Sequence, residues 1–136
     1  NQLKFYNLSF FKVKLMQVNL HNNQGNQFSS YSENSVTINQ LEYSENILVS
    51  AQEIKPLELN SIDDLNQEVL NQLIAMQPDI IIFGTGNKIK YPPTKLLLQL
   101  QNKQIGFEIM PIPALCRTFN YLIGEGRKVL GIIIFN

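Results

Sequence analysis

Two short stretches of this sequence contain residues whose types and spacing suit chemistry. Gly84-Thr85-Gly86 follows an apolar run, and Cys116, Arg117 and Asn120 lie in a later amphipathic segment. Glycines let the backbone approach a bound group, an arginine offers paired donors, and the first turn of a helix has free N–H groups. Together these features predict a site for an anionic ligand. Its candidate residues are Gly84, Thr85, Gly86, Cys116, Arg117 and Asn120.

Each half of this predicted site has a competing structural interpretation. Position 89 is Ile, so the glycine turn lacks the third glycine of a dinucleotide fingerprint and the ending of a phosphate loop. Its competing interpretation is a tight strand exit that needs glycine for steric reasons. Cys116 near a helix start suits a nucleophilic or redox thiol, but it shares a helical stripe with Phe119 and Ile123, which favours a buried, inert side chain.

Alternating strand and helix patterns position both stretches. Strands are predicted at 79–83, 106–110 and 129–135, and helices from the prolines at 92–93 to Gly106 and from 114 to 123. This β-α-β-α-β order implies a largely parallel sheet with right-handed crossovers, although the last strand can run in either direction. Ligands bind at the carboxyl ends of parallel strands. We expect the glycine turn and the start of the second helix to meet at that edge.

The N-terminal half predicts an added antiparallel β element. Residues 16–20 alternate like a short strand, residues 21–33 are rich in Asn, Gln and Ser like an irregular solvated segment, and residues 36–43 predict a hairpin around Asn39-Gln40. We expect residues 47–49 to add a third strand, and an amphipathic helix to follow over residues 62–76. We predict one domain over residues 16–136, with residues 1–15 as an extension outside the fold.

Length and composition limit the class of function. A chain of 136 residues suits a single domain with a substantial core. Its 11 basic and 11 acidic residues give zero net charge, which argues against a nucleic-acid partner and against a polybasic membrane-surface protein. One cysteine and one histidine disfavour a disulfide framework and a protein-only zinc site. We therefore predict no metal and no cofactor.

Targeting and catalytic patterns are absent from the sequence. No apolar run approaches the roughly 18 residues of a spanning helix, so we expect a soluble, cytoplasmic protein without an integral membrane segment. A Cys–His pair would need His21 to arrive from the far N-terminal region, and the predicted site edge has no pair of acids. No catalytic constellation is recognisable, and enzymatic activity is left open.

An ordered series of motifs runs through the second half of the sequence. It comprises Phe83–Gly86, Lys88 and Lys90, Pro92-Pro93, Ile105–Met110, Cys116–Asn120 and Gly124–Arg127. The series resembles the MTH-like domain family of unknown function, whose members include a mitochondrial assembly factor of respiratory complex I and an adipogenesis-associated domain protein. The resemblance covers the chain from about Met16 to Phe135. It implies a compact three-layer α/β domain with a central mixed sheet, and a role in protein–protein assembly.

This chain departs from the family pattern at the predicted site edge. Pro111-Ile112-Pro113 and Leu115 replace more polar and smaller residues, and Phe119 replaces the usual tyrosine. Because the lost hydroxyls weaken the case for chemistry, we predict a protein-interaction or assembly-accessory module with an unknown protein partner. The alternative is a binding domain or enzyme for an anionic small molecule, using Gly84-Thr85-Gly86 and Arg117. A redox role for Cys116 is a third hypothesis.

Overall fold

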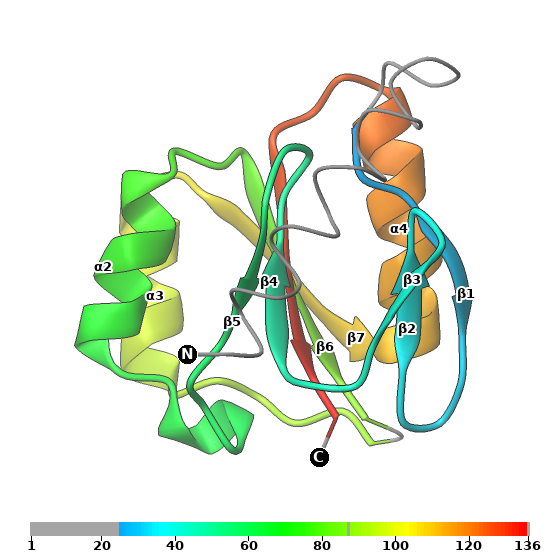
Figure 1. Cartoon of the computed structure of the whole chain (residues 1–136). Helices are drawn as coiled ribbons and strands as arrows, with labels where there is room; N and C mark the ends of the chain where they lie inside the picture. Colours follow the sequence, from blue (N-terminus) through cyan, green and yellow to red (C-terminus); the bar gives the residue numbers. More distant parts are fainter. Residues whose placement is uncertain (1–24, 87, 136) are drawn as a thin grey trace.

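Five strands form the central sheet in the computed structural model, which describes residues 25–86 and 88–135. They are β4 (Ile47–Val49), β5 (Ile54–Pro56), β6 (Ile80–Thr85), β7 (Gly106–Pro111) and β8 (Val129–Ile134). Their order across the sheet is β5-β4-β8-β6-β7 (Figure 1). β6 pairs in parallel with β7 and β8, whereas β4 pairs antiparallel with β5 and β8. The predicted mixed sheet is confirmed, and its last strand runs parallel to β6.

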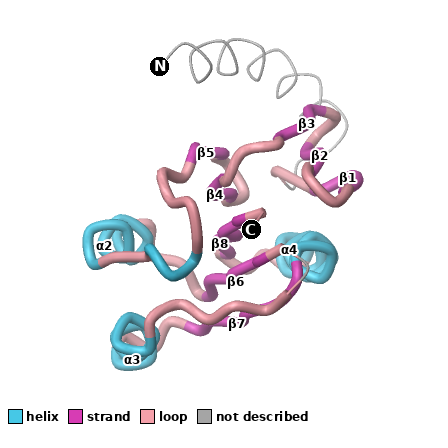
Figure 2. Tube along the Cα trace, turned by 90° about the horizontal axis from the view of Figure 1, so that it is seen from below, coloured by secondary structure: helices cyan, strands magenta, loops and turns pink. Residues whose placement is uncertain are grey.

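Helices cover both faces of this sheet. They are the 3-10 turn η1 (Ile62–Asp64) and the α-helices α2 (Gln67–Ala75), α3 (Thr94–Asn102) and α4 (Ile112–Gly124). α2 and α3 lie on one face and α4 lies on the other, which gives three layers (Figures 1 and 2). Prolines help to begin the last two helices, because a fixed φ suits a first turn: Pro93 precedes α3, and α4 has Pro113 in its first turn. The predicted three-layer α/β class is confirmed.

The prediction of a single helix over residues 62–76 is wrong, because the structure has two separate elements there, η1 and α2. The Ser61 hydroxyl accepts a hydrogen bond from the Asp63 N–H (3.3 Å) and begins only η1. Leu65 then takes an extended conformation, and the Asn66 side chain caps α2 by accepting from the Val69 N–H at 3.0 Å. The apolar spacing continues through this break, so the pattern alone does not reveal it.

A second sheet of three strands lies beside α4. Its strands are β1 (Phe28–Tyr31), β2 (Val36–Ile38) and β3 (Leu41–Tyr43), in that order. β2 and β3 form the predicted hairpin, with Asn39 at φ 51° and Gln40 at φ 75°. Two consecutive residues at positive φ are what a two-residue hairpin turn requires. The predicted hairpin is therefore confirmed.

Two predictions for the N-terminal half are wrong. β1 lies inside the segment predicted to be irregular, because this edge strand buries only Phe28 and so shows no apolar alternation. β4, predicted as a third strand of the small sheet, pairs instead with β8 in the central sheet, where all three of its residues are buried. The predicted strand at 16–20, the extension over residues 1–15 and His21 lie outside the described residues.

Successive side chains of the central strands pack alternately into two separate hydrophobic cores. Ile82 of β6 packs in the core under α4 and the small sheet, while Ile81 and Phe83 pack in the core under α2 and α3. All six residues of β8 are buried. A strand covered on both faces reads as a continuous apolar run, which is why β6 and β8 were recognisable.

Two glycines let α4 approach the central sheet. A Cβ added to Gly84 of β6 would lie 2.7 Å from Cδ1 and 3.3 Å from Cβ of the fully buried Leu115. A Cβ added to Gly131 of β8 would lie 3.5 Å from Cδ2 of Phe119, which is ordinary contact. Gly84 is therefore required by helix–sheet packing, whereas Gly131 leaves room for a methyl group.

These distances predict opposite outcomes for two matched substitutions. Gly84→Ala should lower the free energy of unfolding by about 1–3 kcal/mol, because Leu115 is enclosed and an added methyl overpacks the core. Gly131→Ala should be neutral or stabilising by up to about 1 kcal/mol, since alanine restricts the unfolded chain. Urea denaturation of both variants measures the difference, and equal destabilisation would contradict the packing argument.

Candidate functional site

The glycine turn at the carboxyl edge of the sheet is held by internal hydrogen bonds. Thr85 is fully buried, and its hydroxyl donates to the Lys88 carbonyl (2.8 Å) and accepts from the Lys90 N–H (3.1 Å). The Gly86 N–H donates to the Ile134 carbonyl of β8 at 3.1 Å. The polar groups expected to face a ligand thus hold the loop that follows β6 in place.

Cys116 lies on the inner side of α4. Its side chain is 3% exposed and belongs to the core between α4 and the central sheet. Burial raises the pKa of the Cys116 thiol to about 12, and the neighbouring Arg117 charge offsets that rise only in part. Nucleophilic and redox chemistry need the thiolate and access to solvent. The geometry therefore favours the inert interpretation of Cys116.

Asn120 fastens β1 to α4. Its amide Nδ2 donates to the Phe28 carbonyl and its Oδ1 accepts from the Phe28 N–H, both at 2.8 Å. Next to it, the Phe28 and Phe119 rings meet edge to face, with centroids 5.2 Å apart and planes at 87°. Asn120 thus pairs with β1 as a neighbouring strand would, with one donor and one acceptor of its amide engaged in that contact.

Arg117 points outward on α4 and meets the end of β1. Its Nη1 donates to the Tyr31 hydroxyl at 3.3 Å. Tyr121 lies four residues further along the same helix, so it shares a face with Arg117. Tyr31 is 46% exposed and Tyr121 is 67% exposed. We name these three residues, Tyr31, Arg117 and Tyr121, the Tyr–Arg cluster.

The six predicted site residues thus belong to two structural groups. The hydrogen bonds of Thr85 and Gly86 go to the following loop and to β8, whereas those of Arg117 and Asn120 go to β1. Gly84 is the link between the groups, through its packing against α4. Of the six, Arg117 alone is exposed. A joint ligand site for these residues stays a prediction.

Sequence reasoning missed Tyr31 and Tyr121. Tyr121 carried a usable signal, because it lies at helical spacing from Arg117 and off the apolar stripe of α4. Tyr31 carried none, since its segment was predicted to be irregular. Only the folded chain shows that β1 brings this side chain to Arg117 across 86 positions of sequence.

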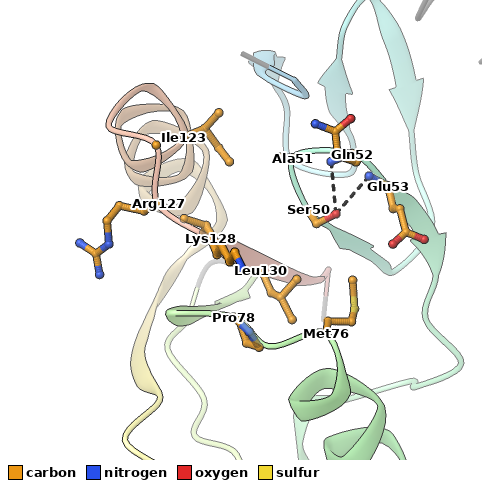
Figure 3. Close-up of a pocket in the computed structure, with 12 residues that line it drawn as sticks. Ser50, Ala51, Gln52, Glu53, Met76, Pro78, Ile123, Arg127, Lys128 and Leu130 are labelled. Carbon is orange, nitrogen blue, oxygen red and sulfur yellow. Dashed lines mark hydrogen bonds between the residues drawn. The ribbon is translucent and has the colours of Figure 1, made fainter. Parts of the chain in front are cut away.

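A cavity of about 420 Å³ lies at the opposite edge of the sheet, where β6 and β8 begin (Figure 3). It is lined by the β4–β5 turn (Ser50, Ala51, Gln52 and Glu53), by Met76 and Pro78, and by Ile123 and residues 126–130. The Ser50 hydroxyl accepts from the Gln52 and Glu53 N–H groups, and Glu53 pairs with Lys55 at 3.2 Å. Arg127 points away from this turn and lies 4.0 Å from the Asp79 carboxylate. These polar side chains serve the turn and the rim, so we assign the cavity no ligand.

Two further properties of the described chain bear on the type of site. Within residues 25–86 and 88–135, no group of three His, Cys, Asp or Glu side chains is arranged to hold a metal ion. None of the helices in that part of the chain combines the length and apolar character needed to cross a bilayer. The cytoplasmic location expected from the sequence stays a prediction.

Comparison with known families decides the membership of this chain. The family described as "Protein of unknown function (DUF498/DUF598)" matches residues 28–134, from the first residue of β1 to the last of β8. The chain belongs to the DUF498/DUF598 family. In agreement with the resemblance noted above, its fold matches that of a Bordetella pertussis protein described as a Mth938-like domain. The TM-score is 0.68 at 19% identity, over 80% of this chain and 85% of the other.

Two relatives of this DUF498/DUF598 protein have descriptive names. It is 28% identical to the "13 kDa major membrane protein" of Francisella tularensis subsp. holarctica, over 79% of this chain and 89% of the relative. It is 29% identical to "NADH dehydrogenase [ubiquinone] 1 alpha subcomplex assembly factor 3" of Rattus norvegicus, over 72% of this chain. The match spans only 54% of the rat protein's length. The predicted relation to a complex I assembly factor is confirmed.

The role of Asn120 predicts a local effect in the DUF498/DUF598 chain. Asn120→Ala should cost about 1–3 kcal/mol of unfolding free energy, because both backbone groups of Phe28 lose their partner. Hydrogen exchange should accelerate most at the β1 amides. Asn102→Ala, at the exposed end of α3, is the matched control and should change neither quantity. Exchange that rises evenly over the whole chain would contradict the role of Asn120 as a local clamp.

The burial of Cys116 predicts both its reactivity and a pH dependence. The folded thiol should resist a thiol-specific disulfide reagent at pH 8 and react at once in denaturant.

Because the pKa of this thiol rises from 9.0 to about 12 on folding, its contribution to stability is complete below pH 9 and declines as pH rises towards 12. Burial also raises the pKa of Tyr43 from 10.0 to about 12, so Cys116→Ala should retain the Tyr43 part of the decline. Rapid labelling of the folded chain would contradict this account.

Proposed function

We propose that this chain is a protein-interaction module that acts as an assembly accessory, and that its partner binds the Tyr–Arg cluster. The name of the rat relative supports assembly as the general role, through the half of that protein which this chain matches. The exposed cluster on α4 and β1 supplies the surface. We keep the cytoplasm as the expected compartment, because a single unpaired cysteine suits a reducing environment.

The composition of the cluster is the observation that supports the proposal most. Tyrosine and arginine are enriched among the residues that dominate binding energy at protein interfaces. A hydrogen bond of 3.3 Å joins Arg117 to the Tyr31 hydroxyl, and Asn120 and Phe119 hold Phe28, at the start of Tyr31's strand. These contacts reduce the conformational entropy that is lost when a partner binds.

The chemistry of Arg117 indicates what the partner presents. A guanidinium has five N–H donors, and the described contacts use one of them, on Tyr31. Among residues 25–86 and 88–135, Arg117 forms no ion pair. A carboxylate of the partner can accept two parallel hydrogen bonds from it, with the faces of Tyr31 and Tyr121 beside the pair. The preferred partner is a protein surface with an acidic residue among apolar ones.

The small-molecule alternative uses the same arginine but has less support. Its other donors, the Thr85 hydroxyl, the Gly86 N–H and the Asn120 amide, are used inside the fold. The two functions differ in a simple measurement. If the chain binds a small anion, that anion at a concentration of about 100 times its Kd raises the melting temperature of the isolated chain. Arg117→Ala abolishes this shift. A protein-binding surface gives no shift with phosphates, nucleotides or small carboxylates.

The two arginines of the chain provide a matched test of the proposal. The immobilised chain is used to capture binding proteins, and the most abundant one is purified and its Kd is measured. Arg117→Ala and Tyr121→Ala should each weaken that Kd by about 30-fold, the effect of losing about 2 kcal/mol at an interface hot spot. Arg127→Ala, at the opposite end of α4, should change the Kd less than about twofold.

Circular dichroism and melting temperature must show that each variant is folded. A Kd that is unchanged by Arg117→Ala and Tyr121→Ala would overturn the assignment of the surface. Equal losses in all three variants would also overturn it, because they would indicate a general charge effect.

A further inference from the structure

A continuous part of this neutral chain is strongly basic. Between Asp79 and Glu108 the sequence has four lysines, at positions 88, 90, 95 and 103, and no acidic residue. All four side chains are exposed. In the part of the chain that the structure describes, none of them forms an ion pair. The zero net charge of the chain therefore conceals a local excess of positive charge.

The first two lysines lie in a loop that the fold holds open to solvent. The Thr85 hydroxyl bonds the Lys88 carbonyl and the Lys90 N–H, and Pro92 is buried at the far end of the loop. Between these anchors every residue from 88 to 91 is exposed, and we name residues 88–91 the lysine loop. It includes Ile89, which is 47% exposed, and Tyr91, which is 66% exposed.

The start of α3 extends the same character. Lys95 and Leu98 are three residues apart and share one helical face, and Leu98 is 52% exposed. The chain from the lysine loop to the start of α3 runs along the lower edge of the molecule in Figure 1, and Figure 2 looks onto that edge. Basic and apolar residues therefore alternate along the lysine loop, and Ile89, Tyr91 and Leu98 are largely exposed and lie outside the core.

We propose that the lysine loop and the outer face of α3 bind the surface of a membrane that contains anionic lipids. In this arrangement Lys88, Lys90 and Lys95 contact headgroup phosphates, while the Ile89 and Tyr91 side chains enter the boundary between headgroups and acyl chains. The chain lies on the bilayer without spanning it, as an interfacial binding element does. This proposal uses residues separate from the Tyr–Arg cluster and does not rest on it.

Two observations favour a lipid surface over an acidic protein. The basic residues here are all lysines, which supply charge without the fixed paired geometry of arginine and so suit mobile headgroups. Exposed isoleucine, tyrosine and leucine between the lysines provide apolar groups that a bilayer interface accepts. One feature opposes the attraction. η1, which contains the exposed Asp63 and Asp64, reaches the same edge beside α2 (Figure 1).

Vesicle sedimentation tests the proposal on the full chain. The chain should sediment with vesicles of phosphatidylcholine and phosphatidylglycerol but not with phosphatidylcholine alone, and binding should weaken with added salt. Lys88→Gln with Lys90→Gln should reduce the partition coefficient about 25-fold, since each lysine near an anionic surface contributes about fivefold. Asp63→Asn with Asp64→Asn should increase it. Ile89→Ser with Tyr91→Ser should weaken binding at every salt concentration, because it removes the inserted groups.

The control is Lys55→Gln with Lys128→Gln, which also removes two positive charges, from Lys55 of β5, paired with Glu53, and from Lys128 at the opposite edge. It should reduce binding less than about twofold. Since Thr85 contacts only the backbone of Lys88 and Lys90, the loop variants should keep the parent melting temperature. The proposal is overturned by absence of binding to anionic vesicles, by equal binding to neutral ones, or by equal losses in control and loop variants. Tight binding of soluble polyglutamate that survives Ile89→Ser with Tyr91→Ser would assign the surface to an acidic protein and likewise overturn it.

Discussion

The close seating of α4 on the central sheet is the constraint on which the other features of the domain depend. Gly84 removes the side chain that would collide with Leu115, and the helix can then bury its apolar stripe against β6 and β8. At that depth Phe119 reaches the Phe28 ring and Asn120 reaches the Phe28 backbone, so one helix joins two sheets. Among the described elements, α4 is the helix that contacts the small sheet most, and buried Asn26 also ties this part of the chain to the β4–β5 turn through Ser50 and Ala51.

This constraint explains why residues that look chemically active serve the fold. Cys116 faces the sheet because the stripe that packs α4 passes through it, and the Asn120 amide is used to replace strand pairing. Thr85 ends a strand that is buried on both faces, so its hydroxyl must find partners inside the protein, and the next loop supplies them. The two surfaces that we propose for other molecules lie outside this packing, on the outer face of α4 and on the rim beyond β6.

The sequence predicted the β-α-β-α-β half well, because runs such as Ile80–Phe83 allow one interpretation when the strand is covered on both sides. β1 was not predictable from local pattern, since distant contacts help to fix its place in the fold, among them Asn120, 92 positions away. The break between η1 and α2 was hidden by apolar spacing that runs through it. The same limit applies to the predicted site. Gly-Thr-Gly has the same appearance whether the hydroxyl faces a ligand or a loop, and only the folded chain shows the Thr85 hydroxyl bonded to Lys88 and Lys90.

The Tyr–Arg cluster and the lysine loop are supported in the same physical way, although their chemistry differs. Each is held from beneath by buried contacts: the Tyr–Arg cluster by Phe119 and Asn120, and the lysine loop by Thr85. Exposed tyrosine, isoleucine and leucine contribute nothing to the core, and ordering them costs conformational entropy whenever they bind. A backbone that already fixes their positions lowers that cost. The internal hydrogen bonds of Thr85 and Asn120 therefore also fix the backbone beneath the two surfaces that we propose for binding.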